Sequence, residues 1–410
     1  MRGTLRFLIL AAGLLPAAGM SGTDVAPLRI ATFNCSLNRP TEGGLRASLA
    51  TRGDAQANAV AEIIQRVRPD ILLLQEFDYD ARGESLRLFE SNYLAQPHGD
   101  AAPLQFPYWF SAPSNTGVPS GFDLDHDGRI GGGGDALGFG EFPGQYGMVL
   151  LSRLPIDAAQ VRTFRGFLWR DMPGALLPDD PATPAPNDWY PPAALAVLPL
   201  SSKSHWDVPL RIGGHTLHLL VSHPTPPAFD GPEDRNGRRN HDEVRFWSDY
   251  LHGANYIRDD AGRAGGLRGR DFLIMGDQNS DPVDGGSIHD AIAALIHDAR
   301  VNQSFVPQSA GAAEAAAGQR GANATQRGDP RFDTADFNDR VAGNLRVDYL
   351  LPSRSIRICD GGVFWPSKSD AAARLVWGDD PPPSSDHRLV WIDVSIGPHQ
   401  CRRSSTPTGQ

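Results

Sequence analysis

The sequence predicts an α+β protein in which two β-sheets pack face to face with helices on the outside. Many short apolar runs are typical of strands, and the few helical patterns lie between groups of strands. The chain has 410 residues, of which 40% are hydrophobic, and it contains 44 Gly and 34 Pro. This mixture indicates a packed core that carries long loops.

The first half of the chain is expected to contain three strands and one long helix. Residues 28–35 (LRIATFNC) have the alternating apolar positions of a strand. Residues 54–67 are expected to form a helix, because Asp54 can cap it and its apolar side chains share one face. Residues 70–77 (DILLLQEF) form a continuous apolar run, which is typical of a buried strand. Residues 147–152 (GMVLLS) have strand character again.

The second half is expected to begin with two paired strands, at 193–200 and 216–222 (TLHLLVS). A polar loop at 223–240 then precedes a helical pattern at 241–257. The remaining expected elements are a buried strand at 272–275, a turn and a helix within 281–296, a mobile Ala- and Gly-rich loop at 310–328, and strands at 345–351, 355–359 and 389–395.

One domain, residues 26–397, is expected to follow a signal peptide at residues 1–21. Arg2 and Arg6 precede a short apolar run, and small residues suited to cleavage come next. The run is short for a membrane span, and a buried first helix is the alternative. We therefore expect a secreted or periplasmic protein. The other predicted segments are loop insertions at 97–146 and 164–192 and a disordered tail at 402–410.

Charge and cysteine content exclude some classes of protein. A net charge of −10 argues against a protein that binds nucleic acid through a basic face. Three cysteines are too few for a disulfide-rich scaffold and lack the close spacing of a zinc site. An exported chain can form a disulfide, and Cys359 and Cys401 are the expected pair because both flank the last strands. Cys35 is expected to be a buried free thiol.

Polar side chains recur at the ends of the apolar runs. A carboxylate in such a place is costly unless it is paired or bound to metal. Taken singly, each polar residue has an ordinary explanation, such as a strand cap or a turn in the segment GDQNSDP. Six such places in one chain predict that the strand ends converge on one site. The residues are Asn34, Gln75, Glu76, Ser222, His223, Asp277, Gln278, Asn279, Asp348, Asp386 and His387.

Seven segments in order carry a resemblance to a known family. They are ATFNC, DILLLQEF, GMVLLSRLPI, LLVSHPTPP, FLIMGDQNSDP, RVDYLLPS and SSDHRLVWIDV, and they extend from about residue 28 to residue 395. Together they resemble the endonuclease/exonuclease/phosphatase superfamily, which includes deoxyribonucleases, abasic-site endonucleases, sphingomyelinases and inositol polyphosphate phosphatases. The resemblance implies a four-layer α/β/β/α sandwich and a phosphoesterase that uses Mg²⁺ or Mn²⁺.

The resemblance also implies a set of metal and phosphate ligands. Glu76 would be the main metal ligand, with Asn34 and Asp386 close to the metal. Asp277 and Asn279 would hold the phosphate or a second cation. Carboxylate and amide oxygens are indeed the ligands that Mg²⁺ prefers.

Two histidines complete the implied site. His387, oriented by Asp348, would activate water, and a histidine needs such an acceptor to fix its tautomer. His223 occupies the position that is His in the deoxyribonuclease and sphingomyelinase branches, whereas abasic-site endonucleases usually have Tyr there. Gln278 departs from the usual Phe or Leu of the Gly-Asp-x-Asn motif. The Glu that supports the matching histidine in deoxyribonucleases has no assignable counterpart.

Three arginines closely follow His223. Arginine forks suit phosphate oxygens, so these side chains are candidate substrate ligands. A solvated charge run before a helix is the equal alternative. The residues are Arg235, Arg238 and Arg239.

The first insertion contains a possible calcium loop. Residues 123–128 (DLDHDG) match the opening of a Ca²⁺-binding loop, whose oxygens alternate along the chain. Gly134 stands where a closing Glu is expected, and Asp135 or Glu141 are the candidate substitutes. An acidic turn is the alternative. The expected ligands are Asp123, Asp125 and Asp127.

These observations predict a secreted, metal-dependent phosphoesterase that hydrolyses a phosphomonoester or a phosphodiester. A small or lipid-linked substrate is favoured over duplex DNA, because the net charge provides no global attraction for a polyanion. The insertions that carry Trp169, Trp189 and Trp206 are expected to wall the cleft. A secreted non-specific endonuclease is the main alternative. A catalytically inactive binding module is the third, and the intact set of polar residues argues against it.

Overall fold

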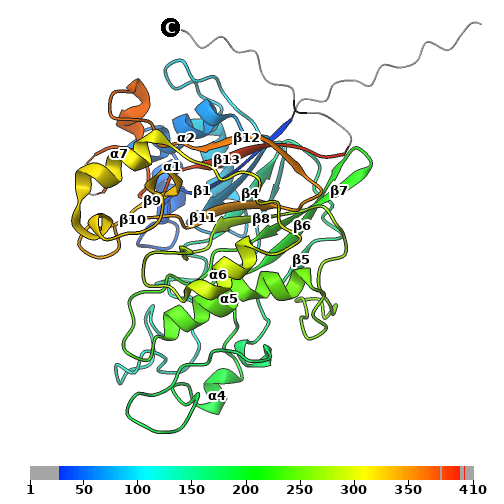
Figure 1. Cartoon of the computed structure of the whole chain (residues 1–410), viewed down its shortest axis with the longest axis vertical. Coiled ribbons are helices and arrows are strands. Elements are labelled where there is room, and N and C mark those ends of the chain that lie inside the picture. Colours follow the sequence, from blue (N-terminus) through cyan, green and yellow to red (C-terminus); the bar gives the residue numbers. More distant parts are fainter. Residues whose placement is uncertain (1–26, 379–380, 398–400, 402–410) are drawn as a thin grey trace, which may run out of the picture.

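The computed structural model describes residues 27–378, 381–397 and 401. Two sheets pack against each other at the centre of the molecule (Figure 1). One is six-stranded, with the order β12-β13-β1-β2-β4-β3, and the other is five-stranded, with the order β11-β8-β7-β6-β5. The pairs β1–β2 and β7–β8 are parallel, and the other pairs in these two sheets are antiparallel. The predicted fold class is therefore confirmed.

The bounds of the elements are as follows. The six-stranded sheet consists of β1 (Leu28–Asn34), β2 (Ile71–Gln75), β3 (Tyr108–Phe110), β4 (Met148–Ser152), β12 (Arg357–Val363) and β13 (Val390–Ser395). The five-stranded sheet consists of β5 (Arg162–Thr163), β6 (Trp206–Ile212), β7 (His215–Val221), β8 (Phe272–Asp277) and β11 (Asp348–Pro352), and a separate ribbon pairs β9 (Ala335–Asp336) with β10 (Asn344–Leu345). The α-helices are α1 (Gly44–Leu49), α2 (Ala55–Val67), α3 (Glu84–Phe89), α4 (Pro192–Leu195), α5 (Arg235–Leu251), α6 (His289–Ile296) and α7 (Ala310–Gln319). Shorter turns are η1 (Glu90–Leu94), η2 (Trp169–Asp171), η3 (Gly321–Ala324), η4 (Pro330–Phe332) and η5 (Ala371–Leu375).

The alternation of side chains along β8 separates the layers. Leu273 and Met275 belong to the core between the two sheets, whereas Phe272 and Ile274 belong to the core under α5 and α6. On the far side, α2 packs its apolar face, including Ile64, onto the six-stranded sheet. Figure 1 shows α5 and α6 side by side, with α4 at one end of the molecule. The order of layers is helix, sheet, sheet, helix, as the resemblance implied.

Helix α2 forms where the sequence predicted it, but α5 begins earlier than expected. Asp54 caps α2, because its side chain accepts a hydrogen bond of 2.9 Å from the amide of Ala57. Helix α5 starts at Arg235, within the segment that was predicted to be a polar loop. Its first turns are polar yet partly buried, and their side chains bond to neighbouring loops. Contacts with residues far away in the sequence stabilise this part of the helix. Such contacts produce no regular spacing of apolar residues, so the sequence pattern did not reveal them.

The prediction of a strand at 193–200 is wrong. Residues 192–195 form the short helix α4, with a proline at the first helical positions, where its missing N–H costs nothing. The strand that pairs with β7 is β6, which contains Pro209. Proline discourages a strand assignment, but β6 pairs with the two-residue strand β5 only at residues 206–207. Beyond those residues β6 is close to an edge strand, which tolerates a proline.

The prediction of a mobile loop at 310–328 is also wrong. Residues 310–319 form α7, and the side chain of Ser309 caps it by accepting a hydrogen bond of 3.2 Å from the amide of Ala312. Alanine has the highest helix propensity of all residues, so an Ala-rich run after a capping serine forms a helix readily. The predicted strand at 345–351 is divided between β10 and β11.

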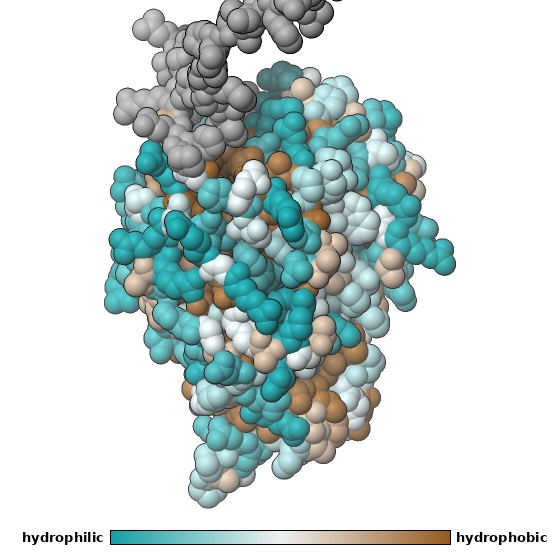
Figure 2. Space-filling model, turned by 90° about the vertical axis from the view of Figure 1, so that its right-hand side faces the viewer, coloured by the Kyte–Doolittle hydropathy of each residue, from teal (hydrophilic) through white to brown (hydrophobic). Residues whose placement is uncertain are grey.

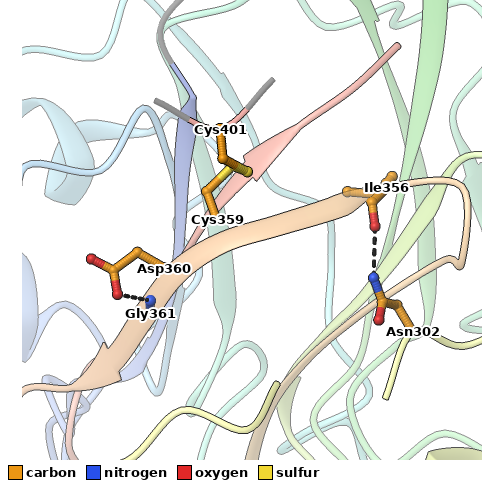
Figure 3. The surroundings of a disulfide bond; sticks show 6 residues. All are labelled: Asn302, Ile356, Cys359, Asp360, Gly361 and Cys401. Carbon is orange, nitrogen blue, oxygen red and sulfur yellow. Dashed lines mark hydrogen bonds between the residues drawn. A yellow bond between two sulfur atoms is a disulfide. The ribbon is translucent and has the colours of Figure 1, made fainter. Parts of the chain in front are cut away.

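The cysteines behave as predicted. Cys359 of β12 forms a disulfide with Cys401, which ties the last described residue to the edge strand of the six-stranded sheet (Figure 3). Cys35 is buried and free, and burial raises the pKa of its thiol to about 12.

The remaining features concern the ends and the surface. The predicted signal peptide (1–21) and the predicted tail (402–410) lie outside the described residues. Among the described helices, none combines the length and the apolar character that a bilayer span requires. The face on the side of β5, β6 and β7 is largely hydrophilic, and its hydrophobic residues gather mainly toward the end that carries α4 (Figure 2).

Candidate active site

The polar residues predicted from the strand ends lie at one end of both sheets. The parallel strands β1 and β2 end at Asn34 and Gln75, which are paired in register. The parallel strands β7 and β8 end nearby, at Val221 and Asp277. Strand β11 runs the other way, so its first residue, Asp348, pairs with Asp277 at the same end. The topology therefore brings residues from five segments of the chain into one place.

Beneath this place, Gln75 links the two sheets. Its Oε1 accepts hydrogen bonds from Thr32 Oγ1 (3.1 Å) and from the amide of Asp277 (2.9 Å). Its Nε2 donates to the carbonyl of Ser222 (3.2 Å). Gly276 has φ 133°, and a Cβ on it would lie 2.2 Å from that same carbonyl. A glycine is required here because a side chain would clash with this carbonyl of the neighbouring strand segment and because L residues rarely adopt this φ.

Glu76 follows β2 in the left-handed conformation, with φ 55°. Its Oε1 accepts from Asn34 Nδ2 (3.2 Å), and its Oε2 accepts from Asn38 Nδ2 (2.9 Å). Burial raises the pKa of this carboxyl, and the charge of Asp386 raises it further. The site therefore holds two neighbouring acids that are costly to ionise together.

Asp277 is the centre of the site, because three side chains approach its Oδ2. Asn34 Nδ2 donates to this oxygen at 3.1 Å. The Nε2 atoms of His223 and His387 lie 3.3 Å and 3.6 Å from it. Burial by itself would raise the pKa of Asp277, but His387 and His223 outweigh burial and hold the pKa below its usual value.

The two histidines have opposite pKa shifts. Burial lowers the pKa of His223 to about 4, and the positive charge of Lys203 adds to this effect. Burial also lowers the pKa of His387, but the carboxylates of Asp348 and Asp277 overcome burial and raise it well above its usual value. His387 Nδ1 lies 2.9 Å from Asp348 Oδ2, whereas the buried Nδ1 of His223 has no hydrogen-bond partner among the residues that the structure describes.

Asp348 and Asn279 are held in place by their own neighbours. Thr334 Oγ1 donates to Asp348 Oδ2 at 2.8 Å. Asn279, with φ 50°, donates its amide to Asp277 Oδ1 at 2.7 Å. Its side-chain Nδ2 donates to the carbonyl of Pro224 at 3.1 Å. Asn279 therefore connects Asp277 to the segment that carries His223.

The donor set suits a hard divalent cation beside Glu76. Asp386 is half-buried, and its Oδ1 accepts only weak contacts from two serine hydroxyls, at 3.3 Å and 3.4 Å. In the described residues, no Arg or Lys nitrogen lies within 4.0 Å of either carboxylate. Two partly buried carboxylates without a basic partner fit a cation such as Mg²⁺. Asn34 joins Glu76 to Asp277 through its Nδ2, and its role as a metal ligand stays a prediction.

A second group of ligand atoms lies within 4.8 Å of one another, in Asp277, Asp348 and His387. Two of these residues are already hydrogen-bonded to each other, through His387 Nδ1 and Asp348 Oδ2. This bond fixes the orientation of the His387 ring and does not use its Nε2, and the acid–base role that the resemblance implied stays a prediction.

The sequence pattern did not identify several residues that shape the site. Asn38 holds Glu76, Thr334 holds Asp348, and Lys203 lies close enough to affect the pKa of His223. Asn38 lies four residues after Asn34 in the same loop, so the motif FNCSLN offered a signal. Thr334 and Lys203 lie in segments with no such signal, because only the folded chain brings them to the strand ends.

Among the described residues, the three arginines after His223 bond to neighbouring loops and not to the predicted site residues. Arg239 is buried and donates to the carbonyls of Leu137, Pro199 and Leu200. Arg238 contacts the segment at 177–179, and Arg235 forms an ion pair with Glu233. These contacts give the arginines a structural role and do not support the prediction that they bind the phosphate.

Two of the three tryptophans that were expected to line the cleft lie elsewhere. Trp169 and Trp206 are buried in the two hydrophobic cores. Trp189 is partly buried and stacks on His126, with 3.9 Å between ring centroids. The tryptophans of the insertions therefore contribute to packing.

The predicted calcium loop brings three carboxylates together. Oxygens of Asp123, Asp125 and Asp135 lie within 4.8 Å of one another. Asp127 is not in this group, and its Oδ1 accepts instead from the amide of Arg129. Of the two candidates for the closing ligand, Asp135 lies with Asp123 and Asp125. Calcium binding stays a prediction.

The chain is similar to a known family in sequence and to solved structures in fold. The sequence model of the Endonuclease/Exonuclease/phosphatase family matches residues 31–387. No curated protein matches the chain in sequence. Similar solved structures include an endonuclease/exonuclease/phosphatase from Beutenbergia cavernae (15% identity, TM-score 0.46, covering 92% of this chain and 73% of that one). Others are sphingomyelinase C from Streptomyces griseocarneus (14%, 0.44, 90% and 99%) and the human Nocturnin catalytic domain (15%, 0.43, 92% and 97%).

Proposed function

The chain belongs to the Endonuclease/Exonuclease/phosphatase family, and from this premise we propose that it hydrolyses a phosphate ester with a divalent metal ion. One observation carries the proposal. Asn34, His223 and His387 approach a single oxygen of Asp277, next to the carboxylates of Glu76 and Asp386. Such a cluster is expensive to bury unless it binds a ligand, and it combines acid, base and metal-binding groups.

Glu76 and Asp386, with Asn34 beside them, would hold the metal, which we propose to be Mg²⁺ or Mn²⁺. When bound, the metal would offset the charge of the phosphate and stabilise the charge that develops in the transition state.

His387 is the proposed base. Because its Nδ1 is bonded to Asp348 Oδ2 at 2.9 Å, its Nε2 faces Asp277 at 3.6 Å, on the side where the substrate would bind. In its neutral form this nitrogen can accept a proton from an attacking water. Asp348 fixes the orientation of the ring and stabilises the imidazolium that results.

His223 is a proposed hydrogen-bond donor to the ester. With a pKa of about 4 it is neutral near pH 7. Its Nε2 lies 3.3 Å from Asp277 Oδ2, which is an acceptor, so we assign its proton to Nε2. The same N–H can donate to a phosphate oxygen or to the leaving oxygen once a substrate is present.

The proposed substrate is a small or lipid-linked phosphate ester. Segments that follow His223 and Asn279 in the chain line a cavity of about 420 Å³. The lining residues are Pro227, Ala228, Asp284, Gly285, Gly286, Ala322, Thr325, Gln326, Val341 and Ala342. Its lining contains no Arg or Lys, and the chain carries a net charge of −10. A neutral or apolar group suits such a cavity better than a second phosphate does. The preference over duplex DNA rests on this charge distribution.

Two further proposals come from the sequence. The disulfide supports export through the segment at 1–21, because such bonds persist in oxidising compartments. The loop of Asp123, Asp125 and Asp135 is proposed to bind a structural Ca²⁺.

A substrate screen tests the main proposal. The full chain, freed of metal by chelation, would be assayed with p-nitrophenyl phosphate, bis-p-nitrophenyl phosphate, a choline phospholipid and plasmid DNA, with and without Mg²⁺ or Mn²⁺. We expect hydrolysis of at least one non-nucleic ester that depends on added metal. Efficient cleavage of plasmid DNA with all other esters untouched would favour the endonuclease. A folded protein that cleaves nothing would favour a binding module.

A further inference from the structure

Lys203 is a buried cation beside the site that has no ion-pair partner. Its exposed fraction is 7%, and in the described residues no carboxylate oxygen lies within 4.0 Å of its Nζ. Nζ donates only one hydrogen bond to the described protein, to the carbonyl of Pro224 at 3.4 Å. A lysine ammonium has three donor hydrogens, and a buried charge is costly unless it is paired. Two donor positions of Lys203 are therefore unused.

The position of Nζ places these donors next to the site. The carbonyl of Pro224 also accepts the side chain of Asn279, at 3.1 Å, and Pro224 directly follows His223. Burial lowers the pKa of Lys203, and the nearby charges of Glu243, Glu76 and Asp277 oppose this shift. An anion that enters between these carboxylates and Nζ would meet a cation on one side.

A buried acid of α5 anchors the segment that carries Lys203, and among the described residues it forms no ion pair with Nζ. Glu243 of α5 is fully buried, and its Oε1 accepts from the amide and the hydroxyl of Ser202, at 2.7 Å and 3.0 Å. Its Oε2 accepts from the amide of Thr225 at 2.6 Å. Glu243 therefore ties the segment of Lys203 to the segment of His223. Neutral donors satisfy this carboxylate, so Nζ stays available.

The chain uses lysine sparingly. It contains 38 Lys and Arg residues together, and only Lys203 and Lys368 are lysines. Lys368 is exposed. Lysine is a compact point charge that can serve a single oxygen, whereas arginine presents a wide planar fork. A narrow buried position that contacts one phosphate oxygen suits lysine.

We propose that Lys203 binds a non-bridging oxygen of the substrate phosphate, opposite the carboxylates that would hold the metal. This inference rests on the proposed function and adds a substrate-binding residue to it. The ammonium offsets the repulsion that Glu76 and Asp277 exert on the anionic ester. The two free donor hydrogens provide the hydrogen bonds, and Pro224 keeps the third.

The first test observes Lys203 directly. The full chain is labelled with ¹⁵N-lysine for NMR, which gives one side-chain signal for each of the two lysines. The signal that disappears in Lys368→Arg belongs to Lys368, and the other belongs to Lys203. Inorganic phosphate is then added in the presence of Mg²⁺, and its binding is followed in parallel by calorimetry. We expect the Lys203 signal to shift and the Lys368 signal to stay. Saturating phosphate that leaves the Lys203 signal unmoved overturns the proposal.

The second test uses kinetics and metal binding. Lys203→Met keeps the length of the side chain and removes its charge, and Lys368→Met is the matched control. We expect Lys203→Met to raise KM and lower kcat/KM by about 10- to 100-fold, the range for a hydrogen bond from a charged group. Mn²⁺ affinity should be unchanged or higher, because a positive charge is lost near the metal ligands.

The outcomes separate this inference from the proposed function. Weaker phosphate binding in Lys203→Met with intact Mn²⁺ affinity supports the inference. Altered Mn²⁺ affinity with unchanged KM shows that Lys203 only balances Glu76 and Asp277, and the inference is then wrong. If Lys203→Met does not fold, the test uses Lys203→Arg. Its guanidinium group is wider than an ammonium group, so we expect KM to rise. A KM equal to that of the wild type overturns the proposal. An inactive wild-type protein would count against the proposed function, while the phosphate titration would still test Lys203.

Discussion

The imidazole of His387 and the carboxylate of Asp348 form a buried hydrogen bond, with 2.9 Å between Nδ1 and Oδ2. Within the described part of the chain His223 has no such partner, since its Nδ1 is buried and makes no hydrogen bond there. This difference explains why the pKa of His387 is raised and that of His223 is lowered to about 4, although burial lowers both. One site therefore contains a histidine that readily holds a proton and a histidine that stays neutral.

Replacement of His387 should abolish most of the activity. His387→Ala removes the proposed base, and we expect kcat to fall at least ~100-fold while the fold is preserved. The exposed His297→Ala is the control. Asp348→Asn should also lower kcat, and the double variant should lose little more than His387→Ala, because the two side chains act as a pair. Near-normal turnover of His387→Ala with metal present would refute the assignment.

Glu76→Gln should weaken metal binding. The substitution keeps the size of the side chain and removes the charge of the proposed main ligand. We expect the affinity for Mn²⁺, measured by calorimetry on chelator-treated protein, to fall at least ~10-fold. The exposed Glu42→Gln should bind as the wild type does. Equal affinities of the two variants would show that the metal, if one binds, is held elsewhere.

Asp333 should make the stability of the protein depend on pH. Burial raises its pKa to about 8, and the charges of Asp281, Asp284 and Asp329 add to this effect. The unfolded chain has a pKa of about 4 for this group, so between about pH 4 and pH 8 the folded state binds the extra proton. The free energy of unfolding of the wild type therefore falls as the pH rises through this window and then levels off.

Asp333→Asn lacks the titrating carboxyl. The Tm of the variant minus the Tm of the wild type should therefore increase from pH 5 to pH 9. The exposed Asp290→Asn provides the control. Thermal unfolding followed by circular dichroism at several pH values measures both. A constant Tm difference between Asp333→Asn and the wild type across this range would contradict the raised pKa.

The acidic loop in the first insertion should bind Ca²⁺. Asp125→Ala removes one of the three carboxylates that lie within 4.8 Å of one another. Calorimetry should detect Ca²⁺ binding to the wild type that Asp125→Ala loses, whereas His387→Ala retains it. If the loop is only an acidic turn that binds no cation, calorimetry should detect no heat of Ca²⁺ binding in any of the three proteins.

The sequence by itself determined the strands that carry the site and most of the residues at their ends. Strands such as β2 and β8 are continuous apolar runs, so burial alone predicts them. Glu76 and Asp277 were recognisable because a carboxylate at the end of such a run needs a partner. The disulfide between Cys359 and Cys401 was predictable from position because both flank the last strands.

Only the tertiary structure decided which distant groups complete the site. Hydrogen bonds join Lys203 and Glu243 to the segment of His223, although these residues are far apart in the chain. Such bonds produce no regular pattern in the local sequence. The same reason explains the early start of α5, where Arg239 donates to the backbone carbonyls of Leu137 and Leu200. Apolar burial has a regular spacing along the chain, whereas a polar contact depends on where the folded backbone places its partner.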